Sequence, residues 1–274
     1  MMILLGIQDV TERKQAEEAL SKAQQALQQH AQGLEQTVAE RTAALRETVH
    51  ELEAFSYSIS HDLRAPLRAM SIFAQILRDS YAGQLDATGL DYLQRISVSA
   101  ARLDLLIQDV LNYTRILGAQ TLLTRLDLDA LVREIIQSYP DWQPPQVDIQ
   151  IEGTLPPVLG HEGFLTQCVS NLLNNAIKFV LPGVQPRVRI WAEPRDAQVR
   201  INFQDNGVGI VPQDHTRIFR MFERIHPATE YEGTGIGLTI VRKAVERMGG
   251  QVDFESELGQ GSKFWIELRK SDPA

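Results

Sequence analysis

Residues 187–210, RVRIWAEPRDAQVRINFQDNGVGI, decide the fold class of the second half of the chain. Apolar and polar residues alternate in 187–193 and again in 198–206, which is typical of strands that bury one face. The second of these strands runs directly into a turn with glycines at 207 and 209. This part of the chain is therefore expected to build a sheet with one face against a core.

The flanking sequence supplies helices for that sheet. A short strand and then a helix are expected within 123–139, with Asp127 or Asp129 as the helix cap. Further segments follow the same patterns: a strand at 147–153, helices at 163–180 and 235–250, and a hairpin with a glycine-rich turn at 251–270. Strands with helices grouped between them predict an α/β sandwich with one layer of each.

Length and composition limit the classes of protein to consider. The 274 residues suffice for about two domains. The formal net charge of −8 argues against a general nucleic-acid binder, which needs a basic surface. A lone cysteine, Cys168, excludes a disulfide framework and fits a reducing compartment, and its apolar helix suggests a core side chain. The apolar start MMILLGI is too short to span a bilayer, so we expect a cytoplasmic protein without a membrane span.

Residues 12–60 carry the pattern of a long helix. They contain almost no glycine or proline, and apolar residues recur with the spacing of a coiled-coil seam. One series of seam positions is Ala31, Val38, Leu45, Leu52 and Ile59, and the other is Leu20, Leu27, Leu34, Arg41, Thr48 and Phe55. A helix with such a stripe needs a partner, so the pattern predicts a dimer.

A second amphipathic helix is expected after a turn-rich break at 81–89. Its buried side would consist of Leu90, Leu93, Ile96, Leu103, Leu106, Ile107, Val110 and Leu111. Two copies of this antiparallel hairpin would pack into a four-helix bundle, because one copy cannot cover so wide an apolar face. The helix fades near 115–120, which suggests a domain boundary.

A histidine lies in the first helix, within FSYSISHDLRAPLRAM, residues 55–70. Pro66 is expected to kink the helix one turn after His61. By spacing alone, His61 could be an ordinary polar residue. However, it lies two positions past the seam residue Ile59 and should face solvent, which favours a reactive role.

Three motifs in the second half could contact a ligand. The turn DNGVGI (205–210) follows a strand, and its glycines would let a ligand approach the backbone, although an ordinary turn is an alternative. GTGIGL (233–238) opens a helix whose free N–H groups could hold phosphate. In NLLNNAIKFV (171–180), Asn171 and Asn175 share a helix face with Lys178; amide oxygens suit Mg²⁺, and a surface amide pair is the alternative.

Taken in order, six segments resemble the transmitter module of a sensor histidine kinase, close to the phytochrome-like, PAS-linked subfamily. They are SISHDLRAPL (58–67), NLLNNAIKF (171–179), DNGVGI (205–210), IFRMFER (218–224), GTGIGL (233–238) and GQGSKFWIEL (259–268). Residues 6–20, GIQDVTERKQAEEAL, resemble the exit from a PAS sensor domain, so we expect the chain to be a fragment or a truncated protein.

The resemblance implies a dimeric helical-hairpin bundle and then a Bergerat-type α/β sandwich that binds ATP. The expected division of the chain is the end of a PAS-like domain (1–11), a coiled-coil signalling helix (12–50), a dimerisation and phosphotransfer domain (51–120), a catalytic domain (121–270) and a tail (271–274). The expected partners are a second copy, an upstream sensor domain and the receiver domain of a response regulator.

The resemblance also implies roles for single residues. Asp205 would accept a hydrogen bond from the adenine amino group, Asn175 with Asn171 would hold Mg²⁺, and Lys178 would lie near the phosphates. Residues 208–234 would form a lid anchored by Phe219 and Phe222, with Arg224 as a lid cation. The nucleotide-binding set is completed by Gly207, Gly209, Gly233, Thr234, Gly235, Ile236, Gly237, Leu238 and Ser262.

The implied reaction is autophosphorylation of His61 by ATP, followed by transfer to an aspartate of a regulator. Asp62 would orient the imidazole. Arg64 could steady the phosphoryl charge or could be a solvated side chain. Many relatives have Thr or Asn four residues after the histidine, which orients water for dephosphorylation of the regulator. This chain has Ala65, so weak phosphatase activity is expected.

Two other functions compete with this interpretation. A Bergerat-fold ATPase would need an acidic residue where this chain has Asn171, which cannot act as a general base. A degenerate kinase could serve only as a dimeric signalling scaffold. The intact motifs favour the kinase.

Overall fold

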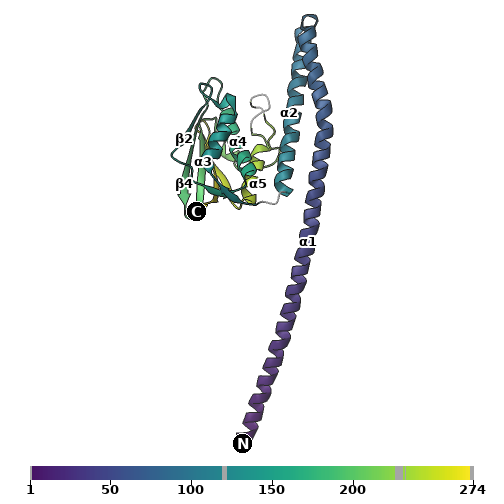
Figure 1. Cartoon of the computed structure of the whole chain (residues 1–274), viewed down its shortest axis with the longest axis vertical. Coiled ribbons are helices and arrows are strands. Elements are labelled where there is room, and N and C mark those ends of the chain that lie inside the picture. The colour runs from purple at the N-terminus through teal and green to yellow at the C-terminus, as the bar shows by residue number, and fades with distance from the viewer. Residues whose placement is uncertain (1, 119–121, 226–230, 232, 272–274) are drawn as a thin grey trace. The chain divides into compact units, whose positions relative to one another are not determined.

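A computed structural model of the chain describes residues 2–118, 122–225, 231 and 233–271, without the side chains of residues 2–19, 21, 26 and 46. The chain divides into two compact units, residues 1–52 and 53–274, and each is described by itself (Figure 1). None of the described helices is both long enough and apolar enough to cross a membrane.

The first unit is the N-terminal part of one helix, α1 (Met2–Tyr81). Its expected seam is uncovered: Leu27 is 71% exposed, and Leu45 is 66% exposed. The helix is as expected, whereas the coiled coil that would cover this stripe remains a prediction.

The second unit begins with a helical hairpin. The end of α1 is followed by the 3₁₀ turn η1 (Ala82–Gln84) and by α2 (Ala87–Gly118), which starts inside the expected break. α1 continues through Pro66, so the proline does not end the helix. Between the helices, Leu67 packs with Ala100, Ile107 and Leu111.

Two of the residues expected on the buried side of α2 are exposed in the single chain. Ile96 is 45% exposed, and Leu103 is 47% exposed. Both line a shallow groove with Leu67, Met70 and Tyr92, because the two helices of one hairpin contact each other along a narrow strip only. The rest of the apolar face is left uncovered, as the bundle prediction requires.

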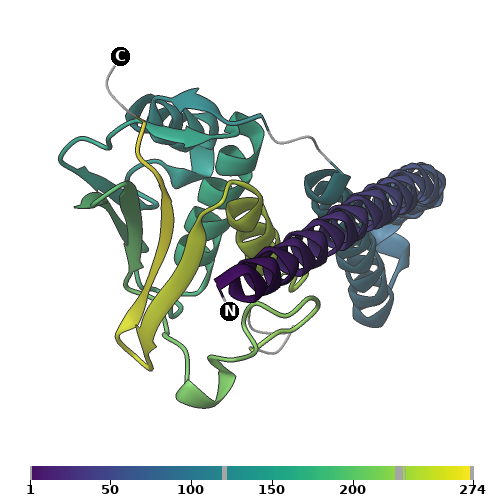
Figure 2. The same cartoon turned by 90° about the horizontal axis from the view of Figure 1, so that it is seen from below.

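The α/β part contains a five-stranded sheet in the order β2-β4-β5-β7-β6, with β2 parallel to β4 and the other neighbours antiparallel. Its helices cover one face, so helices and strands form two layers (Figure 2). The elements are β1 (Thr124–Leu126), α3 (Leu128–Ser138), η2 (Pro140–Trp142), β2 (Asp148–Glu152), β3 (Val158–Gly160), α4 (Glu162–Lys178), β4 (Arg187–Arg195), β5 (Gln198–Asp205), η3 (Pro212–Asp214), α5 (Gly237–Arg247), β6 (Gln251–Glu257) and β7 (Gly261–Arg269).

Most of these elements were expected from the sequence. Asp127 caps α3 by accepting a hydrogen bond from the Ala130 backbone N–H at 3.0 Å, which settles the choice between the two candidate caps. β3 was missed because its three residues are too few to show an alternating pattern of apolar and polar side chains. It pairs with β1. The α/β sandwich itself is confirmed.

The core lies between the sheet and its helices. Alternate residues of the two strands first identified point inward, among them Val188, Ile190 and Ile201, all fully buried. Cys168 is also fully buried in this core, and burial raises the pKa of its thiol. It is therefore a packing residue, as expected.

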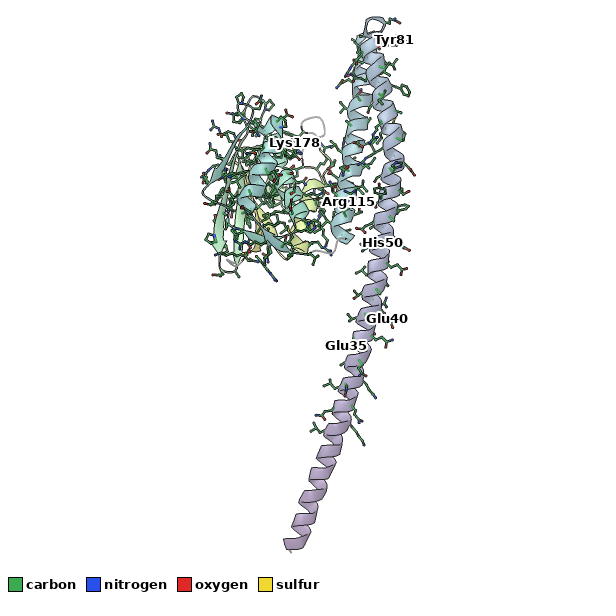
Figure 3. The ribbon with its side chains drawn as sticks, viewed as in Figure 1. Glu35, Glu40, His50, Tyr81, Arg115 and Lys178 are labelled. Carbon is green, nitrogen blue, oxygen red and sulfur yellow. The ribbon has the colours of Figure 1, made fainter. Side chains whose placement is uncertain are left out.

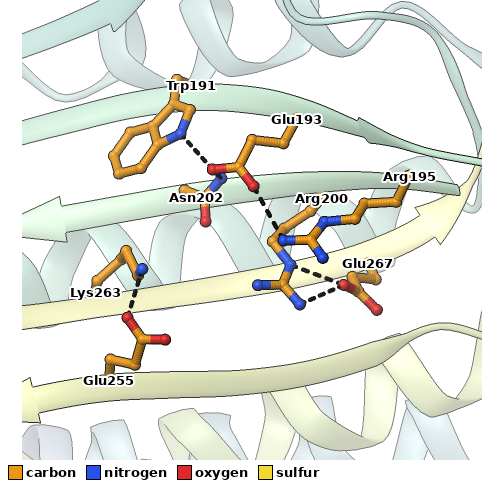
Figure 4. Close-up of polar contacts among 8 residues, drawn as sticks. All are labelled: Trp191, Glu193, Arg195, Arg200, Asn202, Glu255, Lys263 and Glu267. Carbon is orange, nitrogen blue, oxygen red and sulfur yellow. Dashed lines mark hydrogen bonds and ion pairs between the residues drawn. The ribbon is translucent and has the colours of Figure 1, made fainter.

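The outer face of the sheet carries rows of polar and aromatic side chains, set by the strand register (Figure 4). Asn202 lies between Trp191 and Trp265 and is only 1% exposed. One row further along, Arg200 pairs with Glu267 at 2.7 Å, and its guanidinium lies 4.5 Å from the Trp265 ring centroid. This face is stabilised by cross-strand contacts and not by a second layer.

Replacing Arg200 with Met should lower the free energy of unfolding of the α/β part by about 1–3 kcal/mol, since Glu267 would keep a largely buried carboxylate without its partner. Arg195→Met is the matched control, because its pair with Glu193 is about half exposed. Urea unfolding followed by tryptophan fluorescence reports this part selectively, since all three tryptophans lie in it. Equal losses in the two variants would contradict the prediction.

Candidate functional site

One pocket gathers side chains from segments far apart in the sequence. Its wall contains parts of α4, the end of β5, the turn after it, the segment before α5, the start of α5, and β7. Among the predicted site residues, the wall includes Asn171, Asn175, Lys178, Asp205, Gly209, Arg224, Gly233, Thr234, Gly235, Gly237, Leu238 and Ser262. The tertiary structure thus brings twelve predicted positions together around one space.

α4 supplies the amide and ammonium groups. Asn171 donates from its Nδ2 to the Gln167 carbonyl at 2.8 Å, which leaves its Oδ1 as the acceptor on the pocket side. Asn175 lies one turn further along the same wall, and Lys178 ends the helix (Figure 3). The Lys178 ammonium lies 4.1 Å from the centroid of the Phe179 ring.

Asp205 ends β5 and is held by the backbone. Its Oδ1 accepts hydrogen bonds from the N–H groups of Gly207 at 2.8 Å and Ser262 at 3.0 Å. With both bonds on Oδ1, Oδ2 is the oxygen available to a donor in the pocket. Burial raises the pKa of this carboxyl to about 6, and the two N–H groups oppose that rise.

The glycines of the first glycine motif, Gly207 and Gly209, lie in close contact with other backbone segments. A methyl group on Gly207 would collide with the Phe179 carbonyl oxygen, and Gly207 is not part of the pocket wall. Gly209 lines the pocket, but its φ of +72° and its contact with the Glu257 carbonyl already demand glycine. A role of Gly207 in binding a ligand therefore stays a prediction.

The second glycine motif leads into α5, whose N-terminus borders the pocket. The N-cap residue Ile236 has no side chain that could accept a hydrogen bond. The first backbone N–H groups of α5 therefore donate to no capping side chain. A Cβ on Gly237 would lie 2.6 Å from Asn171 Oδ1, so the close approach of α5 to α4 requires glycine here. Ile236 itself is fully buried in the core and does not line the pocket, contrary to expectation.

The expected lid is anchored differently from the prediction. Phe219 packs against the core and lies 6.0 Å from the Phe254 ring centroid, whereas Phe222 is 60% exposed with a φ of +62°. The anchors are thus Phe219 and the buried Ile218, and Phe222 is not one. Arg224 donates to the Tyr231 carbonyl at 2.6 Å. Positions 226–230 and 232 of the lid lie outside the described residues.

The predicted phosphoacceptor group lies on the hairpin, outside the pocket wall. His61 is exposed, with 79% of its side chain accessible, and its Nδ1 lies 3.3 Å from Asp62 Oδ1. Arg64 forms an ion pair with Asp104 at 3.2 Å and donates to Gln108, both on α2. The alternative of a solvated Arg64 is therefore wrong, because its guanidinium joins the two helices of the hairpin.

Several wall residues were missed by the sequence analysis. Phe179 and Asn174 stand inside a quoted motif but had no assigned role, and Tyr231 packs on Phe179 at 5.2 Å between ring centroids. Leu105 and Asp109 come from α2, and no local pattern links them to this pocket. The others are Val208, Ile210, Ile218, Glu223, Ile225 and Phe264.

Comparisons with known families match the two parts of the second unit. Residues 51–118 match the His Kinase A (phospho-acceptor) domain, and residues 160–272 match the histidine kinase-, DNA gyrase B- and HSP90-like ATPase family. No described group of three or more His, Cys, Asp or Glu side chains could hold a metal ion.

Individual relatives agree with the family matches. The chain is 33% identical over 219 residues to the phytochrome-like protein Cph1 of Synechocystis, covering 80% of this chain and 29% of that protein. It is 32% identical to the sensor histidine kinase AruS of Pseudomonas aeruginosa, covering 86% and 25%. The structure of full-length ShkA in complex with AMPPNP has a TM-score of 0.59 at 30% identity, covering 80% of this chain and 46% of that one.

The chain thus spans about a third or less of the length of these curated relatives. Both domains occur in the order that the motifs predicted, and the relatives share both parts. The chain therefore carries the transmitter module of a sensor histidine kinase, a phospho-acceptor domain followed by an ATPase domain.

Proposed function

We propose that this chain is an ATP-dependent protein-histidine kinase that phosphorylates His61 and then transfers the phosphoryl group to an aspartate of a receiver domain. The observation that carries the proposal is the pocket that joins Asp205, the α4 amides, Lys178 and the uncapped start of α5. Each group matches one part of ATP.

The pocket offers different groups to the base and to the phosphates. Asp205 Oδ2 would accept from the adenine amino group, beside the apolar side chains of Ile210 and Phe264. Lys178 and the N-terminus of α5 would bind phosphate oxygens through positive charge and N–H groups. Adenine and phosphates would then bind to different groups of the same wall.

Mg²⁺ fits the donor set on α4. Asn171 has its Nδ2 tied to Gln167, so its carbonyl oxygen remains for a cation, and Asn175 lies one turn away. Mg²⁺ accepts few protein ligands and completes its shell with phosphate and water oxygens. When bound, it would neutralise charge that develops on the phosphates.

The chemistry is an attack of the imidazole on the γ-phosphorus. In the tautomer whose Nδ1–H donates to Asp62, Nε2 would carry the lone pair for the attack. A bond from Nε2 to phosphorus forms, and the bond from phosphorus to the β–γ bridging oxygen breaks, with its electron pair leaving on ADP. The exposure of His61 gives ATP and a receiver aspartate access to the same nitrogen.

His61 is not in the pocket wall, so transfer requires another arrangement of hairpin and ATPase domain or the pocket of a second copy. A second copy would cover the uncovered hairpin face at Met70, Tyr92 and Ile96. We include an upstream sensor domain and a receiver domain among the partners. The need for ATP places the proposed activity in the cytoplasm.

Transfer to histidine fits the site better than ATP hydrolysis. The pocket side of α4 carries Asn171, whose amide cannot take a proton from water. A purely scaffolding role would leave the groups that match ATP without use. The kinase is therefore the function that the geometry supports best.

Replacing His61 with Gln should abolish labelling by γ-labelled ATP, because no other nitrogen would take its place as acceptor. His50→Gln, on the same helix and exposed, is the matched control and should label like the wild type. Label retained by His61→Gln would move the acceptor elsewhere. An unlabelled wild type that still binds ATP would favour the scaffold.

Ala65→Thr should increase dephosphorylation of the receiver domain that the wild type phosphorylates fastest. Ala65 is exposed on α1 one turn after His61, and it has no group that could orient water. The measurement is the decay of receiver phosphate with each protein, and Ala65→Val controls for side-chain size. A high wild-type rate that the threonine does not raise would contradict the prediction.

Asp205→Asn should remove a pH dependence from ATP binding. Because the pKa of Asp205 is raised to about 6, its carboxylate is ionised at pH 7.5 and loses its acceptor oxygen by protonation below pH 6. Wild-type affinity should then fall by up to about tenfold per pH unit. The variant should bind weakly and show a smaller pH dependence than the wild type, since only the titration of the ATP phosphates, which both proteins share, remains. The measurement is titration calorimetry from pH 5 to 7.5. Equal slopes for both proteins would contradict the assignment.

The same substitution should stabilise the α/β part at neutral pH. The cost of the buried charge is absent below about pH 4, grows as the pH rises from 4 to 6, and is complete above that. The amide oxygen of Asn can still accept from Gly207 and Ser262. Asp205→Asn should therefore gain about 1–3 kcal/mol at pH 7.5 and little at pH 4, measured by urea unfolding. A loss of stability at pH 7.5 would contradict the argument.

A further inference from the structure

α2 has a second packing face besides the one that contacts α1. Leu106, Val110 and Tyr113 pack against the core of the α/β part, and Ile116 is 1% exposed within it. These four positions share one face of the helix by their spacing. The phosphotransfer hairpin is thus docked on the ATPase domain through α2.

This docking carries an acidic side chain into the nucleotide pocket. Leu105 and Asp109, one turn apart on α2, both line the wall. Asp109 Oδ2 accepts a hydrogen bond from the Thr234 hydroxyl at 2.5 Å. Burial raises the pKa of Asp109, while the bond from Thr234 and the charge of Lys178 act in the opposite direction. The carboxylate is therefore close enough to Lys178 to be stabilised by it.

Thr234 and Lys178 belong to the end of the pocket where the phosphates of ATP would bind. Gly233 closes this end, since a Cβ at that position would lie 3.0 Å from the Lys178 ammonium. A carboxylate here satisfies the same donors as a phosphate oxygen. It also adds a negative charge beside the triphosphate, and two like charges in a partly buried site repel each other strongly.

We propose that Asp109 of the phosphotransfer hairpin sets the affinity of the pocket for ATP by competing with the phosphates for Thr234 and Lys178. The inference rests on the proposed function, because it takes the pocket to be the ATP site. By linkage, ATP then weakens docking of α2 to the same extent that docking weakens ATP binding. Binding of the substrate would release the hairpin for the arrangement in which His61 reaches the γ-phosphate.

The test is titration calorimetry of the full chain with ATP, ADP and adenosine in the presence of Mg²⁺. Asp109→Asn removes the charge but keeps an oxygen for Thr234. It should bind ATP about fivefold or more tightly than the wild type, ADP less so, and adenosine unchanged. Asp91→Asn removes the same charge from an exposed position of α2 and should leave all three affinities as they are.

Hydrogen exchange provides a second readout that does not depend on a variant. ATP should increase amide exchange in 102–113 of the wild type, whereas adenosine, which lacks phosphates, should not.

An equal gain in affinity for adenosine and ATP in Asp109→Asn would overturn the inference, since charge would not be the cause. Weaker binding of ATP with Mg²⁺ would also overturn it, because the carboxylate would then help to hold the cation.

Failure of the proposed function has a different result. If neither wild type nor Asp109→Asn binds ATP, the pocket is not an ATP site, and the inference falls with it. If both bind ATP equally well, the ATP site stands and the role of Asp109 is refuted.

Discussion

The close packing of α4 against α5 is the contact on which the rest of the site depends. Gly237 at the start of α5 lies against the Asn171 side chain, with no room for a Cβ between them. Deeper in the core, the Cys168 thiol of α4 lies 3.8 Å from the Val241 carbonyl of α5. This packing brings the free N–H end of one helix beside the amides and the lysine of the other. The proposed phosphate site thus depends on two helices that share a core.

The sheet supplies another part of the pocket wall, the carboxylate of Asp205, whose partial burial lowers the stability of the fold. Asp205 is partly buried at the end of β5, and the loss of solvation there raises its pKa to about 6. Two backbone N–H groups fix one oxygen and leave the other for a ligand. A partly buried carboxylate with one open oxygen can bind a ligand but lowers the stability of the fold, a trade-off that is common at functional sites. The glycines around it permit this geometry by letting neighbouring backbones approach.

α2 gives the two parts of the transmitter a shared helix. One face holds α1 through Leu67 and Ile107, and another packs on the ATPase domain through Val110 and Tyr113. Asp109 lies next to this second face and accepts a hydrogen bond from Thr234. Docking of the hairpin therefore places a negative charge where the phosphates of the nucleotide are proposed to bind. If His61 reaches ATP within one copy, as one form of the proposed reaction requires, these contacts must break, and the energy of docking would then enter the rate of autophosphorylation.

The sequence by itself determined the elements and most of the site, because both depend on local patterns. Alternation in 187–193 and 198–206 predicted the central strands, and the spacing of Asn171, Asn175 and Lys178 predicted one helix face. Only the tertiary structure decided which residues of other elements join them. It placed Asp109 in the pocket, moved the lid anchor from Phe222 to Ile218, and paired Arg64 with Asp104. These outcomes depend on packing between segments distant in the chain, which leaves no periodic trace in either segment.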